Sequence, residues 1–224
     1  MKTKAPTPKK ARTRILIVDD HPIVRKGIAD LVGQKPDFLV CGDADRVEDA
    51  LPAIDQLKPD LVIVDLSLKG AGGLELLKDL KIRHPEIPAL VLSMHDETLF
   101  AERALRAGAR GYVMKQEAVN ELEHAIRRVL SGKIYLSQAM SDRLLHMVSQ
   151  GEKVRDRSPM ERLSDRELEV FEMIGRGLPM REIAKELHLS VKTIETHRAH
   201  IKEKLSITSA VQLVQHATQW VHGR

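Results

Sequence analysis

Two short apolar runs in the first third of the chain each end in aspartate. Residues 15–18 read Ile-Leu-Ile-Val and precede Asp19 and Asp20, and residues 61–64 read Leu-Val-Ile-Val and precede Asp65. Runs this short, this rich in β-branched residues and this free of polar residues are typical of strands buried on both faces of a parallel sheet. Because the carboxyl ends of parallel strands meet at one edge of such a sheet, we expect the three aspartates to lie together.

Three carboxylates in one place are costly to remove from water unless a cation offsets their charge. A hard divalent ion such as Mg²⁺ accepts a few carboxylate ligands, and a carboxylate beside it can act as a nucleophile toward phosphorus. Aspartates at strand ends also cap turns and helices, which is the alternative for Asp65 taken alone. Two strand ends with the same pattern, one of them doubled, favour the metal site.

Strand-like and amphipathic segments alternate five times between residue 15 and about residue 130. Five such units with short connections predict an open, doubly wound α/β sheet, (βα)5. We adopt for it the strand order 2-1-3-4-5, which is taken from known sheets of this kind and not from the pattern of this sequence. The strands are predicted at residues 15–19, 38–42, 61–65, 88–93 and 110–114, and the helices at residues 22–33, 46–57, 73–83, 96–107 and 117–131. Gly70, Gly72 and Gly73 predict a turn after the third strand.

Two further polar residues stand at strand ends. Ser93 ends the fourth predicted strand and Lys115 follows the fifth, so the same topology would bring both to the edge that carries the acids. A hydroxyl and an ammonium there could hydrogen-bond the oxygens of a phosphoryl group. Taken alone, Ser93 could be a cap and Lys115 a solvated lysine, but together with the aspartates they favour a phosphoryl site.

The C-terminal part of the chain is predicted to be all-α. A polar stretch with Gly151 and Pro159 predicts a linker before it. Ser164 and Glu167 have the spacing of a capping box, and Ser190 is the expected N-cap of a later helix. Four helices are predicted, at about residues 164–174, 180–187, 191–205 and 209–221. A short helix, a turn and a longer helix are the arrangement of a helix-turn-helix.

Length and cysteine content limit the class of protein. The 224 residues are enough for two domains. The lone Cys41 excludes an internal disulfide and fits a reducing compartment. No apolar run approaches the ~20 residues that span a bilayer, and the N-terminus lacks the apolar segment of a secretory signal. We therefore expect a cytoplasmic protein with no membrane partner.

The formal net charge of +4 is unevenly distributed. Residues 1–14 carry six Lys/Arg, two prolines and no acid, which predicts a disordered basic tail, either solvated or in contact with nucleic acid. Residues 15–131 carry 15 basic and 20 acidic residues, whereas residues 163–224 carry nine basic and eight acidic residues. The C-terminal helices therefore attract nucleic acid weakly, and pairing of two copies would raise their affinity.

The acids and their spacing make residues 15–131 resemble the receiver domain of bacterial two-component response regulators. The resemblance implies that Asp65 accepts a phosphoryl group from a sensor histidine kinase. It also implies a Mg²⁺ site formed by Asp19, Asp20, Asp65 and the backbone carbonyl of Ser67.

The same resemblance gives roles to three more residues. Ser93 corresponds to the switch hydroxyl, Lys115 to the lysine that contacts phosphate, and Tyr112 to an aromatic side chain that rotates. A phosphoryl group on Asp65 is expected to draw Ser93 toward it, and Tyr112 to fill the space left behind. The sequence departs from the family at Lys69, where proline is common, and in having no proline after Lys115.

About residues 160–220 resemble the LuxR-type helix-turn-helix domain of the NarL/FixJ subfamily. The matching motifs are Leu163-Ser164-Asp165-Arg166-Glu167, Gly177-Leu178, Arg181-Glu182-Ile183-Ala184, Ser190-Val191-Lys192-Thr193-Ile194-Glu195-Thr196-His197 and Ile201-Lys202-Glu203-Lys204-Leu205. The resemblance implies that helix 191–205 enters the major groove of double-stranded DNA. A small helical bundle that binds another protein is the alternative.

Helix 191–205 is expected to present one face to DNA and another to the core. The expected DNA-binding residues are Lys192, Thr193, Glu195, Thr196, Arg198, Ala199 and Lys202. Glu195 could accept from a cytosine amino group, and Thr196 could touch a thymine methyl group. The predicted core residues are Ile194, Ile201 and Leu205. His197 is expected to be packed or close to phosphate rather than a metal ligand, since no set of partner ligands surrounds it.

The family forms homodimers through its last helix, which here offers Val211, Val214 and Val221. These valines could instead close the core of the helical domain. We divide the chain into a tail at residues 1–14, a receiver domain at 15–131, a linker with a helical segment at 132–162, and a helix-turn-helix DNA-binding domain at 163–224.

The sequence is thus interpreted as a phosphorylation-activated, DNA-binding transcription regulator with Mg²⁺ as cofactor and RNA polymerase as a candidate further partner. It is not expected to be an enzyme, apart from Mg²⁺-dependent self-phosphorylation and autodephosphorylation at aspartate. Two alternatives come from other classes: a stand-alone phosphohydrolase with an aspartyl intermediate, and an interaction module that works without phosphorylation.

Overall fold

The computed structural model of the protein describes residues 12–68, 72–149 and 159–222. Most of the predicted basic tail, the departure at Lys69, Gly70 of the glycine turn and residues 150–158 of the predicted linker lie outside these ranges. Contacts divide the chain into two compact units, residues 1–143 and 144–224. Among the described residues, no helix is both long and apolar enough to cross a membrane.

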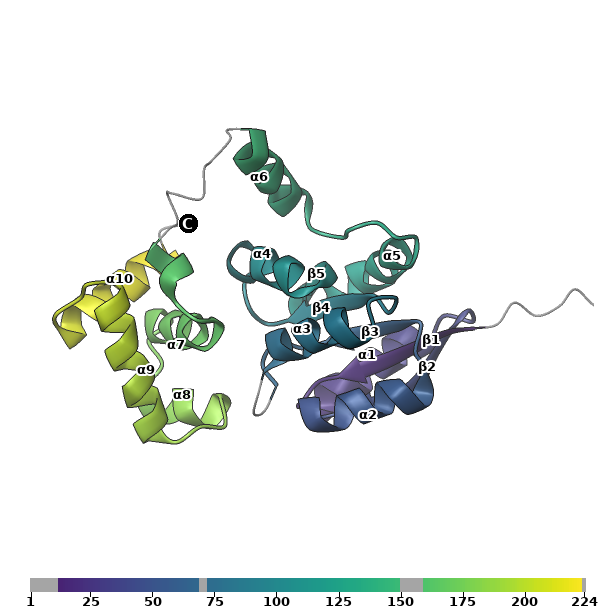
Figure 1. The fold of residues 1–224 in the computed structure, drawn as a ribbon, viewed down its shortest axis with the longest axis horizontal. Helices are drawn as coiled ribbons and strands as arrows, with labels where there is room; N and C mark the ends of the chain where they lie inside the picture. The colour runs from purple at the N-terminus through teal and green to yellow at the C-terminus, as the bar shows by residue number, and fades with distance from the viewer. Residues whose placement is uncertain (1–11, 69–71, 150–158, 223–224) are drawn as a thin grey trace, which may run out of the picture. The chain divides into compact units, whose positions relative to one another are not determined.

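The N-terminal unit is built on a five-stranded parallel sheet with the order β2-β1-β3-β4-β5 (Figure 1). This confirms the predicted fold class and strand order. The strands are β1 (Thr13–Val18), β2 (Phe38–Ala44), β3 (Leu61–Val64), β4 (Ala89–Ser93) and β5 (Ala109–Met114). The predicted apolar runs are strands that are buried on both faces, because every residue from 15 to 18 and from 61 to 64 is at most 1% exposed.

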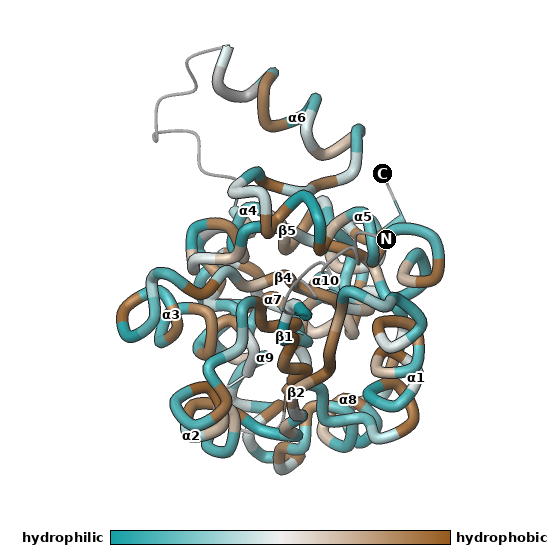
Figure 2. Tube along the Cα trace, turned by 90° about the vertical axis from the view of Figure 1, so that its right-hand side faces the viewer, coloured by the Kyte–Doolittle hydropathy of each residue, from teal (hydrophilic) through white to brown (hydrophobic). Residues whose placement is uncertain are grey.

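Five helices flank this sheet. They are α1 (Pro22–Gly33), α2 (Val47–Leu57), α3 (Gly73–Arg83), α4 (Glu97–Ala107) and α5 (Ala118–Leu130). α1 and α5 pack together on one face, where Ile28 and Ile126 join Ile15, Ile17 and other strand residues in one core cluster. On the other face, α3 lies in contact with α2 on one side and with α4 on the other. In Figure 2 much of β1 and β2 is brown, whereas α2 alternates between brown and teal.

The chain after α5 returns to the sheet. Tyr135 forms an isolated parallel bridge with Gly111 of β5, in which the Tyr112 amide donates to the Tyr135 carbonyl (2.9 Å) and the Tyr135 amide to the Arg110 carbonyl (3.0 Å). The bridge covers part of an exposed sheet edge. Residues 132–143, which we placed in the linker, thus group by contacts with the first unit. The helix α6 (Gln138–Ser149) follows.

The C-terminal unit contains the four predicted helices. They are α7 (Asp165–Gly175), α8 (Met180–Glu186), α9 (Val191–Lys204) and α10 (Ala210–His222), preceded by a 3-10 turn, η2 (Pro159–Arg162). Phe171 of α7 lies edge-on to Trp220 of α10, with ring centroids 5.4 Å apart. Ile194 and Ile201 are fully buried as predicted. Leu205 is only partly buried, because it is the C-cap residue at the end of α9.

The predicted caps are formed. The Ser164 side chain accepts from the Glu167 amide (3.3 Å), and the Glu167 carboxylate accepts from the Ser164 amide (2.7 Å), which completes the capping box of α7. The Ser190 hydroxyl accepts from the Thr193 amide (3.0 Å) at the start of α9. Each cap satisfies amides that have no partner within the helix.

Candidate functional site

The three strand-end aspartates converge. Asp19 and Asp20 follow β1 and Asp65 follows β3, and these strands pair so that Val18 lies opposite Val64. All three aspartates are at most 4% exposed. Ligand atoms of Asp19, Asp20, Asp65 and the adjacent His21 all lie within 4.8 Å of one another.

Glycine closes the loop that follows Asp65. The amide of Gly73 donates to the carbonyl of Leu66 (2.9 Å). A Cβ atom at position 73 would lie 2.0 Å from the carbonyl oxygen of Asp65, so only glycine allows α3 to begin this close to the site. Gly72, with φ of +80°, supplies the left-handed backbone at the same turn.

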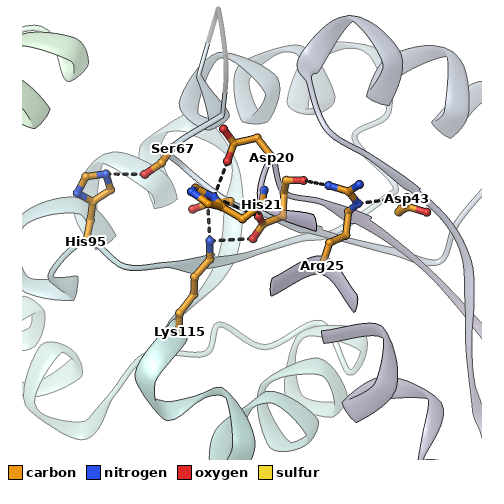
Figure 3. Close-up of polar contacts among 9 residues, drawn as sticks. Asp20, His21, Arg25, Asp43, Ser67, His95 and Lys115 are labelled. Carbon is orange, nitrogen blue, oxygen red and sulfur yellow. Dashed lines mark hydrogen bonds and ion pairs between the residues drawn. The ribbon is translucent and has the colours of Figure 1, made fainter. Parts of the chain in front are cut away.

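Lys115 supplies positive charge between two of the acids. Its ammonium lies 2.7 Å from Asp19 Oδ2 and 2.6 Å from Asp65 Oδ2 (Figure 3), and its side chain is 8% exposed. Burial opposes the charge on Lys115, but Asp65 and Asp19 outweigh it and raise the pKa of the lysine. Burial raises the pKa of the Asp65 carboxyl, with Lys115 opposing and Asp19 adding to the rise. One ammonium thus faces more than one buried acid.

Two further residues hold the acidic pair in place. The backbone amide of His21 donates to Asp19 Oδ1 (2.8 Å), and its ring Nδ1 lies 2.6 Å from Asp20 Oδ1. Arg25 of α1 donates to the Asp19 carbonyl (2.6 Å) and pairs with Asp43 (Figure 3). Neither residue was selected from the sequence, although both lie within six positions of the aspartates.

The donor set fits a hard divalent cation. Three buried carboxylates in reach of one point are the ligands that Mg²⁺ takes, and the ion usually retains several waters. Asp65 Oδ1 is buried and has no hydrogen-bond partner of good geometry among the described residues. A buried carboxylate oxygen without a well-aligned donor is unfavourable, and a cation would satisfy it.

The predicted switch residues lie near this site and share one neighbour. Ser93, the last residue of β4, is fully buried, and its hydroxyl accepts from the amide of His95 (3.3 Å). Tyr112 of β5 is 1% exposed, and its hydroxyl donates to the carbonyl of His95 (2.9 Å). The Ser67 hydroxyl lies 3.0 Å from the His95 ring nitrogen Nε2 (Figure 3). His95 was not selected from the sequence, where a single histidine after a strand carries no pattern.

The C-terminal unit contains the predicted short helix, turn and longer helix. α8 and α9 are joined by a turn in which His188 has φ of +52°. Of the seven predicted DNA-binding residues, those exposed are Lys192, Glu195, Thr196 and Ala199, and those half-buried are Thr193, Arg198 and Lys202. His197 is half-buried, and burial lowers its pKa, with the Arg166 guanidinium adding to the effect. Half-burial is compatible with either position that we expected for it, packed or close to phosphate.

The three valines of the predicted dimer surface are not alike. Val211 and Val214 of α10 are 67% and 44% exposed, whereas Val221 is half-buried. A Cβ atom added at Gly175 would lie 2.6 Å from Val221 Cγ2, so Val221 packs against the end of α7. Val211 and Val214 are therefore the more exposed of the three valines, and the dimer surface stays a prediction.

Comparison with known families gives two matches that lie in tandem. Residues 15–127 match the family described as "Response regulator receiver domain", and residues 161–217 match the family described as "Bacterial regulatory proteins, luxR family". The response regulator GacA of Pseudomonas aeruginosa is 38% identical over 210 residues, which cover 94% of this chain and 96% of GacA. The oxygen regulatory protein NreC of Staphylococcus aureus is 34% identical over 208 residues, which cover 91% of this chain and 96% of NreC.

Solved structures are similar along nearly the whole chain. RcsB of Salmonella enterica serovar Typhimurium, bound to the promoter rprA with the phosphomimetic BeF3⁻, is 28% identical with a TM-score of 0.60, covering 92% of this chain and 98% of RcsB. A structure of two RcsB dimers on two parallel DNAs is 29% identical, with a TM-score of 0.56 and the same coverage. The chain therefore belongs to the response regulators that join a receiver domain to a LuxR-type helix-turn-helix domain and regulate transcription.

Proposed function

We propose that Asp65 is the phosphoacceptor of this response regulator and that a sensor histidine kinase is its donor. The observation that carries this proposal is the convergence of Asp19, Asp20 and Asp65, two of which contact Lys115. Asp19, Asp20, Asp65 and the backbone carbonyl of Ser67 would hold Mg²⁺. When bound, the ion neutralises the charge of the phosphoryl oxygens.

The chain itself would contribute one nucleophile and one cationic side chain to the reaction, besides the ligands of the ion. A carboxylate oxygen of Asp65 forms a bond to phosphorus while the phosphorus–nitrogen bond of the donor phosphohistidine breaks, and the released imidazole takes up a proton. Lys115 already lies 2.6 Å from Asp65 and would bond the oxygens of the transferred group. The activity is confined to self-phosphorylation and autodephosphorylation.

The new charge would be sensed by Ser93 and Tyr112. The hydroxyl of Ser93 accepts from the amide of His95 and would donate its own proton to a phosphoryl group on Asp65, so a shift of Ser93 toward that group would pull on the loop at His95. The hydroxyl of Tyr112 holds the carbonyl of the same residue, so movement of this loop also loosens Tyr112. A local charge change would in this way bias a loop between two positions.

The output would be binding of promoter DNA by homodimers in the cytoplasm, with RNA polymerase as a candidate further partner. The exposed face of α9 supports major-groove contact by the seven residues from Lys192 to Lys202 named above. The nearly neutral charge of this domain favours paired copies, since one copy alone gains little from phosphate contacts. Val211 and Val214 are the exposed apolar residues of α10 that would meet. RcsB, the relative described above, has been solved as dimers on DNA.

Footprinting on genomic DNA with and without acetyl phosphate tests this function. We expect each protected DNA site to consist of two half-sites. After phosphorylation, protection should appear at a lower protein concentration. Protection that is identical in both conditions, and also with BeF3⁻, would favour the phosphorylation-independent interaction module. No protection in either condition would favour a protein-binding role for the helical unit.

Replacing Lys192 by Ala is expected to weaken binding to every DNA sequence alike, because a phosphate contact carries no base information. The slope of log affinity against log salt is negative, and its magnitude should decrease by about 0.9 for each copy bound. Filter binding at several salt concentrations measures this slope. Lys133→Ala, which removes an exposed lysine of the other unit, is the control. An unchanged slope would place Lys192 away from the DNA backbone.

A further inference from the structure

His95 contacts three residues of the proposed phosphorylation site. No role has been assigned to His95 so far. Its ring bonds the Ser67 hydroxyl, its amide donates to Ser93 and its carbonyl accepts from Tyr112. The ring also lies 4.5 Å, centroid to centroid, from the ring of Phe100 in α4. His95 itself is 4% exposed. One residue thus touches the loop after β3, the end of β4 and the middle of β5.

The side chain and the backbone of His95 make different contacts. The bonds to Ser93 and Tyr112 use the backbone, so they survive a change of side chain. The side chain alone makes the bond to Ser67. Ser67 is two residues after Asp65, and its own backbone carbonyl is the proposed metal ligand. The ring of His95 is therefore the described link between the loop after β3 and the loop after β4.

We propose that His95 is a positioning residue that ties the loop carrying Ser67 to the loop following Ser93, so that the metal-binding loop and the switch hydroxyl are held in register. The proposal rests on the proposed function, because it gives His95 a part in building that metal site. A loop held in place by a partner binds a cation without first being ordered, and this preorganisation raises affinity. Loss of the link should weaken metal binding even when no phosphodonor is present.

Three variants of the full chain separate this role from simple packing. Ser67→Ala removes the hydroxyl of a half-buried residue and leaves the backbone carbonyl in place. His95→Phe retains a ring against Phe100 and removes the ring nitrogen. His95→Gln offers an amide that can bond Ser67 again. His124→Phe is the matched control, since this histidine on α5 has a side chain that is 68% exposed.

Titration with Mn²⁺, followed by the loss of the free-ion paramagnetic resonance signal, measures the affinity of the site. We expect Ser67→Ala and His95→Phe each to weaken Mn²⁺ binding about 2- to 10-fold, the range for one net hydrogen bond. The double variant should be no weaker than either single variant, His95→Gln should recover most of the loss, and the control should match the wild type. The Mg²⁺ concentration for half-maximal labelling by acetyl phosphate should rise, with the rate at saturating Mg²⁺ unchanged.

Wild-type affinity in either single variant, or additive losses in the double variant, would overturn the role of His95. Those outcomes leave the proposed function intact if the wild type is still labelled at Asp65. A wild type that takes up neither Mn²⁺ nor label would overturn both proposals. Ser67→Ala deletes only one oxygen from a half-buried side chain and should still fold. The role of His95 can therefore be tested even where a His95 variant does not fold.

Discussion

Asp65→Asn and Asp65→Ala are expected to take up no phosphoryl label from acetyl phosphate, whereas the wild type should take up as much as one phosphoryl group per chain. The amide of asparagine has the shape of the carboxylate but lacks its nucleophilic charge, and no acyl phosphate can form on it. Asp19 and Asp20 are also buried in the site, but they would hold the ion rather than attack phosphorus. Incubation with radiolabelled donor and Mg²⁺ measures the uptake, and release by hydroxylamine identifies an acyl phosphate.

Asp49→Asn serves as the control, because this aspartate of α2 is exposed and outside the acidic cluster. It should be labelled like the wild type. Label retained in the Asp65 variants would refute the acceptor assignment. Release of many phosphates per chain with a simple phosphate ester as substrate would instead favour the stand-alone phosphohydrolase.

The sheet and the acidic cluster were predictable from the sequence for one physical reason. A strand buried on both faces must be continuously apolar, so the first polar residues after it mark the sheet edge. Asp19 and Asp65 stand directly at that point, as does Ser93 at the end of β4. Because neighbouring parallel strands end together, a one-dimensional pattern fixes a three-dimensional cluster. The capping box at Ser164 was predictable for a similar reason, since both partners lie within one helical turn.

The contacts that the sequence left out depend on long-range geometry. His95 meets Ser67 across 28 positions of the chain, and Tyr135 returns to β5 across 24 positions. Neither residue belongs to a periodic pattern, so nothing local marks its partner. The contact of Tyr135 was missed for the same reason: the chain after α5 has the local features of a linker, but Tyr135 pairs with the edge strand β5. Helix periodicity also overstated the burial of Leu205, because it does not show where the packed part of a helix ends.

Replacing Lys115 by Met is expected to lower the free energy of unfolding of the N-terminal unit by about 3–5 kcal/mol in metal-free buffer at pH 7, the range for removing one partner of a buried ion pair. The ammonium lies between Asp19 and Asp65, and methionine keeps an unbranched side chain, one atom shorter, while removing the charge. Urea unfolding followed by circular dichroism measures the loss. Trp220, the only tryptophan, reports the C-terminal unit separately by fluorescence and should show an unchanged midpoint.

Mg²⁺ should stabilise the Lys115→Met variant more than the wild type, because the variant retains the anionic site without its internal cation. Lys26→Met, which removes an exposed lysine of α1, should respond to Mg²⁺ as the wild type does. An equal response of Lys115→Met and wild type would show that the ammonium and the metal do not share the carboxylates.

The destabilisation of Lys115→Met should also depend on pH in a defined direction. Burial already raises the pKa of Asp65 in the folded protein, and loss of the opposing ammonium raises it further. A carboxyl with a raised folded pKa contributes its stability below its unfolded pKa and loses it as pH rises through the folded value. Lys115 stays charged throughout this window, because its own pKa is raised from 10.5. The difference in free energy of unfolding between Lys115→Met and the wild type should therefore become smaller as pH falls from 7 toward 4. A difference that becomes larger would mean that Lys115 does not offset the charge of these carboxylates.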